Sequence, residues 1–262
     1  MKKSLLIAIV LISVFISHAQ DSVLYRSKIW VSGKDTLNYR VLYPENYASS
    51  KKYPLVVFLH GAGERGNDNK SQLKHGGHLF ANDTAREQFP AIVIFPQLPR
   101  DSTWARMKFE PDTVTKKVKF IFPFTGEPTV PEALVKGLID SLRNEKFVDK
   151  KRIYIGGLSM GGFGTFDMIA LYPDYFAAAF PICGGGNIDN APRFAKKLPL
   201  WIFHGDADNV VNVEYSRSYY KALKDLGGKV KYTEYPGVGH NSWDNAFAEK
   251  DLLPWLFSKK KR

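Results

Sequence analysis

The sequence predicts an α/β fold, with a mostly parallel central sheet and helices on both faces of it. Apolar runs such as 55–59 and 91–95 are continuous rather than alternating, which is typical of strands covered on both faces. Stretches with helical spacing alternate with these runs along the chain. This alternation argues for parallel strands joined by crossover helices.

A predicted β-hairpin begins the folded part of the chain and forms an antiparallel edge of the sheet. Residues 23–31 and 36–43 flank Ser32-Gly33-Lys34-Asp35, a turn that contains glycine. The other strands are expected at 55–59, 91–95, 152–158, 176–182, 198–203 and 229–235.

Helices are predicted between these strands. Thr129-Val-Pro-Glu132 is a capping-box pattern, and it begins an amphipathic helix that ends at about Asn144. Further helices are expected over 160–171 and 214–226, the second of them ended by two glycines. A final helix over 247–258 is expected to be interrupted by Pro254.

Residues 101–130 do not follow this alternation. They contain three prolines and several aromatic residues without a clear period, which predicts an insertion over one end of the sheet, as a lid or the wall of a subsite. Aromatic side chains stack on sugar and phenolic rings, so Trp104 and, further along, Trp243 are predicted to bind substrate. A core position is predicted for Phe120, Phe122 and Phe124.

Length and composition fit one large α/β domain over 20–262. Hydrophobic residues make up 44% and charged residues 24% of the 262, which excludes a disordered chain. The single cysteine, Cys183, cannot form an internal disulfide. The net charge of +11 suggests an acidic partner. Part of that charge lies in the first segment and in the tail 259–262, and the chemistry below does not require it, so no nucleic-acid partner is predicted.

Residues 1–19 have the pattern of a secretory signal peptide. Lys2 and Lys3 give a positive start, Leu5 to Ile16 is an apolar run, and small residues precede a cleavage point after Ala19. The apolar run is too short to cross about 30 Å of hydrocarbon, and no cysteine near the cleavage point offers a lipid anchor. The expected protein is secreted or periplasmic, without stable membrane insertion.

The segment Gly157-Leu158-Ser159-Met160-Gly161 lies between a predicted strand and a predicted helix. This is the setting of a nucleophile elbow, in which the glycines allow a tight turn that exposes the serine. Free N–H groups at the start of the helix stabilise developing negative charge. Ser159 is therefore the predicted nucleophile.

A serine nucleophile needs a base, and the base needs a carboxylate to orient it. His240 follows the last predicted strand in a glycine-rich loop, and imidazole titrates near neutral pH. Asp206 and Asp208 follow an earlier strand. The order serine, aspartate, histidine is that of an α/β-hydrolase triad, with either aspartate as its acid.

These motifs resemble those of α/β-hydrolase esterases of the phospholipase/carboxylesterase and polysaccharide-esterase type, which include feruloyl and acetylxylan esterases and a group of predicted peptidases. The resemblance lies in residues 59–66, 157–162, 204–208 and 239–243, and it spans nearly the whole mature chain. The family pattern H-G-x-x-D implies Asp208 as the acid rather than Asp206. The family also implies an oxyanion hole formed by the backbone N–H groups of Ala62 and Met160.

The other histidines are predicted to be structural. His60 and His204 each precede a glycine at the end of a strand. His75 and His78 could suggest a metal pair, but no carboxylate or cysteine accompanies them nearby, so a structural role is favoured. No metal and no cofactor is predicted.

The expected function is that of a serine carboxylic-ester hydrolase that forms an acyl-enzyme. Acyl esters of polysaccharides or oligosaccharides, feruloyl or acetyl, are the expected substrates. A serine peptidase on the same fold is the alternative, and a non-catalytic glycan-binding domain is a second one. A binding domain would not need the serine, histidine and aspartate together.

Overall fold

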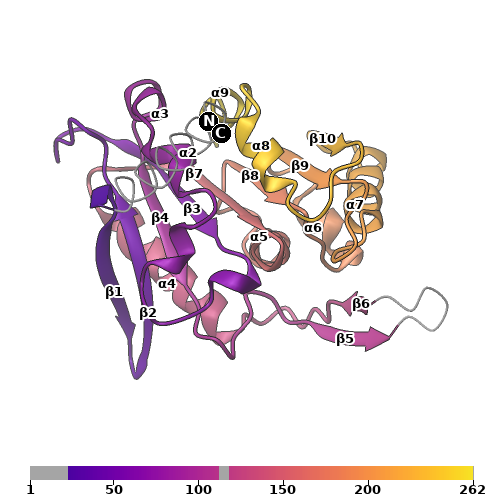
Figure 1. The fold of residues 1–262 in the computed structure, drawn as a ribbon. Coiled ribbons are helices and arrows are strands. Elements are labelled where there is room, and N and C mark those ends of the chain that lie inside the picture. The colour runs from indigo at the N-terminus through magenta and orange to yellow at the C-terminus, as the bar shows by residue number, and fades with distance from the viewer. Residues whose placement is uncertain (1–22, 112–117, 262) are drawn as a thin grey trace, which may run out of the picture.

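The computed structural model describes residues 23–111 and 118–261, whose core is an eight-stranded sheet in the order β1-β2-β4-β3-β7-β8-β9-β10 (Figure 1). The strands from β4 to β10 in this order pair in parallel, whereas β1 with β2 and β2 with β4 pair antiparallel. The predicted mostly parallel α/β sheet with an antiparallel N-terminal hairpin edge is confirmed. The strands are β1 Arg26–Ser32, β2 Asp35–Leu42, β3 Tyr53–Leu59, β4 Ile92–Gln97, β7 Val148–Leu158, β8 Ala178–Ile182, β9 Leu200–Gly205 and β10 Val230–Tyr235.

Helices cover both faces of the sheet, because successive side chains of a strand point to opposite faces. In β3, Leu55, Val57 and Leu59 belong to one apolar core, and Val56 and Phe58 belong to another. The first core includes side chains of α4 Val130–Asn144, α5 Met160–Leu171, α6 Ala191–Phe194 and α7 Glu214–Asp225. The second includes side chains of α2 Gly77–Ala81, α3 Asp83–Gln88, α8 Trp243–Ala248 and α9 Leu252–Phe257 (Figure 1).

The helix ends follow the predicted signals, with one exception. Thr129 and Glu132 form the predicted capping box at the start of α4, and Gly227, with a φ of 70°, follows α7. The single helix predicted over 247–258 is wrong, since α8 and α9 are separate short helices. Pro254 lies in the first turn of α9, where a missing N–H costs no intrahelical hydrogen bond.

The predicted insertion contains a second, two-stranded sheet, β5 Lys108–Pro111 and β6 Val118–Ile121, which extends away from the main sheet (Figure 1). The hydroxyl group of Tyr215 on α7 accepts a hydrogen bond from the N–H of Phe120 and donates one to its carbonyl oxygen, at 2.9 and 3.0 Å. Phe122 is buried and packs against Phe163 of α5, as the core prediction requires, whereas Phe120 and Phe124 are only partly buried against the same core. The role of a lid or subsite wall stays a prediction.

The predicted signal peptide lies outside the described residues. Within the ranges that the structure describes, no helix combines the length and apolar character needed to cross a membrane.

Two carboxyl groups, buried Glu132 on α4 and partly buried Asp167 on α5, form a pair. Glu132 is 1% exposed, and one of its oxygens accepts hydrogen bonds from the N–H and hydroxyl groups of Thr129 at 2.7 and 2.8 Å. Burial, together with the charge of Asp167, raises the pKa of Glu132 to about 8. The pair therefore holds a proton at neutral pH in the folded protein.

The change in unfolding free energy caused by replacing Glu132 with glutamine is expected to be more favourable at pH 8 than at pH 5. Between the unfolded pKa of Glu132, 4.5, and its folded pKa of about 8, the folded wild type binds more protons than the unfolded chain. Stability of the wild type therefore falls as the pH rises through this window, by on the order of a few kcal/mol at most. Urea unfolding at pH 5 and pH 8 measures the difference between the two proteins. A difference that is equal at both pH values, or that also appears in the control Glu127→Gln at an exposed position, would disprove the shared proton.

Candidate active site

Ser159 lies at the sharp turn between β7 and α5, at the carboxyl end of the parallel strands. Its φ of 53° and ψ of −117° are strained for a residue with a side chain, a conformation that costs about 1–3 kcal/mol. Hydrogen bonds hold the turn: the N–H of Ser159 donates to Ile182 at 2.9 Å, and its carbonyl accepts from Phe163 at 3.0 Å. This is the backbone of the predicted nucleophile elbow.

The glycines around Ser159 are required by close packing. A Cβ atom on Gly161 would lie 1.9 Å from the carbonyl oxygen of Leu59, and one on Gly157 would lie 2.4 Å from that of Gly161. The first turn of α5 therefore packs directly against the end of β3. This contact brings Ser159 beside the loop that follows β3.

His240 and Asp208 complete a hydrogen-bonded row with Ser159. The Nε2 atom of His240 lies 2.9 Å from Oγ of Ser159, and its Nδ1 atom lies 2.8 Å from Oδ2 of Asp208. An ionised carboxylate can only accept, so Nδ1 carries the proton and Nε2 is free to accept the proton of Ser159. The three predicted residues, distant in sequence, are thus placed as nucleophile, base and orienting acid would be.

Asp208 is held in its ionised form. Its side chain is fully buried, which by itself favours the neutral acid. Hydrogen bonds from His204 and His240 and from the N–H groups of Val210 and Val211 outweigh burial and hold the pKa of Asp208 far below its usual range. The carboxylate therefore keeps its negative charge beside His240 at neutral pH.

Asp206 takes no part in this row. It is exposed, and its carboxylate accepts a hydrogen bond of 2.6 Å from the N–H of Gly237. Asp206 thus fastens the loop that carries His240, while Asp208 contacts the imidazole itself.

The loop that carries the predicted oxyanion donor Ala62 is fixed by His60. Burial lowers the pKa of His60 to about 4, so its ring is neutral at neutral pH. Nδ1 lies 2.6 Å from the carbonyl of Gly61, and Nε2 accepts the N–H of Leu98 at 3.0 Å. These contacts agree with the structural role predicted for His60.

Ala62 and Met160 are each the first residue of a helical segment. The first N–H groups of such segments have no partner inside the helix. Both segments lie at the carboxyl ends of neighbouring strands, β3 and β7. The placement suits two backbone donors, and their role in an oxyanion hole stays a prediction.

The two tryptophans predicted to bind substrate lie in different surroundings. The prediction for Trp104 is wrong: this side chain is 1% exposed, packs against Gly164 of α5 and donates a hydrogen bond of 2.9 Å to the carbonyl of His60. Trp104 thus anchors the beginning of the insertion to the core. Trp243 is half-buried, and the centre of its ring lies 5.4 Å from that of His240.

A carboxylate that the sequence does not predict lies beside His75. Glu64, a buried residue of the loop after β3, approaches the Nε2 atom of His75 to 3.6 Å. His75 in turn packs against Trp243, with ring centres 5.0 Å apart. Residues 64 and 75 are too far apart for a pattern within one helix or turn to pair them, so this contact could not be predicted from the sequence.

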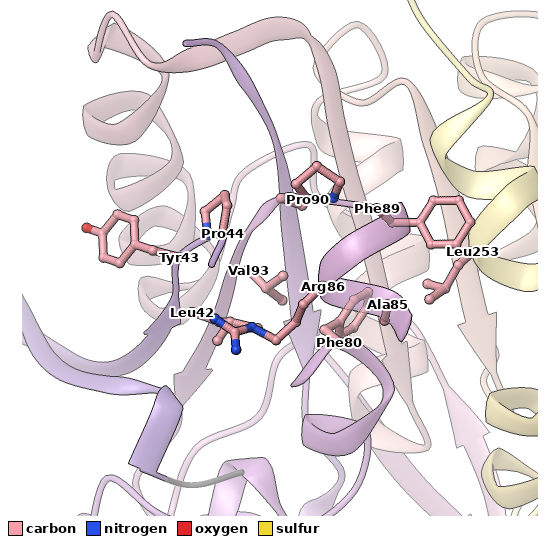
Figure 2. Close-up of a pocket in the computed structure, with 11 residues that line it drawn as sticks. Leu42, Tyr43, Pro44, Phe80, Ala85, Arg86, Phe89, Pro90, Val93 and Leu253 are labelled. Atoms are coloured by element: carbon pink, nitrogen blue, oxygen red, sulfur yellow. The ribbon is translucent and has the colours of Figure 1, made fainter. Parts of the chain in front are cut away.

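A small cavity lies at the opposite end of the sheet from Ser159. It has a volume of about 10 Å³ and is lined by residues that include Leu42 at the end of β2, Arg86 of α3 and Val93 of β4 (Figure 2). A cavity of this size holds about one water molecule. It is too small for an ester substrate.

Removal of metal ions is expected to leave activity unchanged. Within the described ranges, Cys183, Asp208 and His240 have ligand-type atoms within 4.8 Å of one another. Burial and the charge of Asp208 raise the pKa of the Cys183 thiol far above its usual range, so the thiolate that a metal requires is disfavoured. Asp208 and His240 already bond to each other. Ester hydrolysis measured before and after dialysis against EDTA tests this, and a loss that added Zn²⁺ restores would contradict it.

Comparison with known proteins agrees with this geometry. Residues 127–250 match the model of the family described as Phospholipase/Carboxylesterase. The match includes the elbow, both aspartates and His240. The chain is an α/β-hydrolase of the phospholipase/carboxylesterase family.

Individual relatives support this membership. The chain is 28% identical to carboxylesterase SOBER1 of Arabidopsis thaliana over 71% of this chain and 82% of that protein. It is 25% identical to the bifunctional acetylxylan esterase/xylanase XynS20E of Neocallimastix patriciarum, over 61% of this chain and only 25% of that protein. A solved thermostable esterase is 36% identical, with a TM-score of 0.81, over 92% of this hydrolase and 64% of that chain. The hydrolase thus spans a quarter of one of these relatives and under two thirds of another.

Proposed function

We propose that this hydrolase cleaves carboxylic esters through an acyl-enzyme formed on Ser159. His240 removes the proton from Ser159 as the hydroxyl oxygen attacks the ester carbonyl, and Asp208 stabilises the imidazolium that forms. The N–H groups of Ala62 and Met160 stabilise the oxyanion. His240 then gives its proton to the leaving alcohol, and a water molecule, activated in the same way, releases the acid. The unbroken hydrogen-bonded row from Ser159 to Asp208 carries this proposal.

Acetyl or feruloyl esters of polysaccharides or oligosaccharides are the substrates that we propose. One relative is named for acetylxylan esterase activity. A solved ferulic acid esterase shares 17% identity, which supports the fold alone. Trp243 offers an aromatic face beside His240 on which a sugar or phenolic ring could stack.

A serine peptidase is the second candidate, because solved acylaminoacyl and dipeptidyl peptidases share the fold. Their identity to this chain is 19% and 17%, and the chain covers 42% and 36% of them. Likeness at this level extends to the fold and not to the substrate.

Two assays decide between these candidates. Hydrolysis of p-nitrophenyl acetate tests for the esterase, with the Ser159→Ala variant as the control. Release of acetate or ferulate from acylated xylo-oligosaccharides is then compared with cleavage of peptide p-nitroanilides. Turnover of esters without amide cleavage is expected, and faster cleavage of the amides would favour the peptidase. Acylated oligosaccharides that react no faster than p-nitrophenyl acetate would contradict the proposed substrate class.

We also propose that the protein is exported with cleavage after Ala19, from the charge and apolar pattern of residues 1–19. N-terminal sequencing of the protein recovered outside the cytoplasm is expected to begin at Gln20. An unprocessed N-terminus would contradict the proposal.

A further inference from the structure

A second histidine, His204, contacts the same carboxylate oxygen as His240. Its Nε2 atom lies 3.2 Å from Oδ2 of Asp208, and Nδ1 of His240 lies 2.8 Å from that oxygen. The side chains of His204 and Asp208 are fully buried, whereas that of His240 is 20% exposed. His204 belongs to β9, so the sheet itself fixes its position.

The proton of His204 can be placed from its partners. Nε2 also lies 3.0 Å from the carbonyl oxygen of Val211, and a carbonyl can only accept. Nε2 therefore carries the proton and shares it between Val211 and Asp208. In the neutral ring Nδ1 then accepts, and the buried hydroxyl of Ser216, 2.7 Å away on α7, donates to it. Ser216 thus fixes which nitrogen of His204 faces Asp208.

Asp208 consequently lies between two serine–histidine pairs, Ser159 with His240 and Ser216 with His204. Its other oxygen, Oδ1, accepts the N–H groups of Val210 and Val211 at 2.8 and 2.9 Å. Each oxygen therefore has two donors, and the carboxylate cannot rotate without losing some of them. Of these two pairs, Ser159 with His240 is accessible to solvent, whereas Ser216 and His204 are buried.

We propose that His204, oriented by Ser216, is a positioning residue that sets both the direction and the charge of Asp208 for His240. This inference rests on the proposed function. The N–H of His204 draws negative charge from Oδ2 and so weakens the hold of Asp208 on the proton that His240 must pass to the leaving alcohol.

Other titratable groups around this row are compensated or neutral. The thiol of Cys183, in the loop after β8, stays protonated because it is buried. On β10, beside β9, Glu234 is paired with Arg217 of α7 at 2.6 Å. Replacing His204 is therefore expected to act on this row through the lost N–H donor to Asp208 and not through these other groups.

Two amide variants separate the nitrogens of His204. In His204→Gln the amide nitrogen takes the place of Nε2, so a donor to Asp208 is kept. In His204→Asn the amide lies at the place of Nδ1, so the contact with Ser216 is kept and that with Asp208 is lost. The asparagine variant is expected to lower kcat by about 10- to 30-fold, as for the loss of one hydrogen bond to a charged group. With less charge drawn from Asp208, the acid limb of the kcat/KM profile is expected to move up by about 0.5–1 pH unit.

The glutamine variant is expected to keep the acid limb at the wild-type pH. If both variants lose activity equally and the acid limb stays in place, His204 only packs in the core, and the proposal is wrong. Urea unfolding of each variant corrects for folded fraction. Should the asparagine variant not fold, Ser216→Ala tests the same row, with a fall in kcat of about 3- to 10-fold expected for the loss of one neutral hydrogen bond. An unchanged kcat in that variant would overturn the role of Ser216.

Two measurements keep this inference apart from the proposed function. The ¹⁵N spectrum of histidine side chains at pH 7 should show the ring of His204 protonated at Nε2, whatever the activity, and a ring protonated at Nδ1 would contradict the inference. Labelling of Ser159 by a fluorophosphonate tests the proposed function. Wild-type protein that is not labelled refutes that function, whereas labelled protein with an unmoved acid limb in His204→Asn refutes only the role of His204.

Discussion

Ser159→Ala is expected to reduce kcat for p-nitrophenyl acetate by about 10⁶-fold. The remaining activity is that of a site that still binds the ester and stabilises its oxyanion but has no nucleophile. Alanine keeps the side-chain volume nearly unchanged, and Ser159 N–H and C=O keep their hydrogen bonds to Ile182 and Phe163. The fold is therefore expected to survive. Initial-rate kinetics of the purified variant measure the loss.

Circular dichroism and the urea midpoint provide the control for this variant. Both should equal those of the wild type to within the small effect of a half-buried hydroxyl group. Turnover at the wild-type rate in a folded Ser159→Ala protein would show that the nucleophile lies elsewhere.

Asp208→Asn is expected to lower kcat by about 10³–10⁴-fold. An amide group at this position can donate to Nδ1 of His240, which then carries its proton on Nε2 and cannot accept the proton of Ser159. The amide also lacks the negative charge that stabilises the imidazolium. Steady-state kinetics across pH 6–9 test the prediction, and KM should change far less than kcat.

The matched control for this variant is Asp206→Asn, two residues earlier in the same loop. Asp206 is exposed and accepts the N–H of Gly237, and an asparagine oxygen can accept that bond as well. Its kcat is expected to stay within about threefold of the wild type, since an exposed substitution rarely costs more than about 0.5 kcal/mol. A severe loss of kcat in Asp206→Asn with a mild one in Asp208→Asn would show that Asp206, and not Asp208, is the acid that orients His240.

Local signals predicted the sheet and its helices well. Continuous apolar runs marked the buried strands, and the capping box at Thr129 and Glu132 marked the start of α4. These signals lie within a few residues of each other, so a single sequence contains them. The serine, aspartate and histidine motifs could be placed for a similar reason, because each directly follows a strand and parallel strands end at one edge of the sheet.

Contacts between distant segments could not be predicted in this way. Trp104 is predicted to bind substrate because it is an aromatic residue of the insertion, but its indole N–H bonds to the carbonyl of His60, 44 residues away. Glu64 beside His75 and Ser216 beside His204 depend likewise on how loops and helices pack. The hairpin β5–β6 escaped prediction because its two strands are only four residues long each and β5 is exposed along its whole length.

Covalent labelling of the nucleophile tests the central claim most directly. The wild-type protein is incubated with a fluorophosphonate, digested and analysed by mass spectrometry, with Ser159→Ala and Asp208→Asn treated in parallel. One phosphonyl group on the peptide that contains Ser159 is predicted for the wild type, none for Ser159→Ala, and much slower labelling for Asp208→Asn. An unlabelled Ser159 in folded wild-type protein, or a label on another residue, would contradict the account.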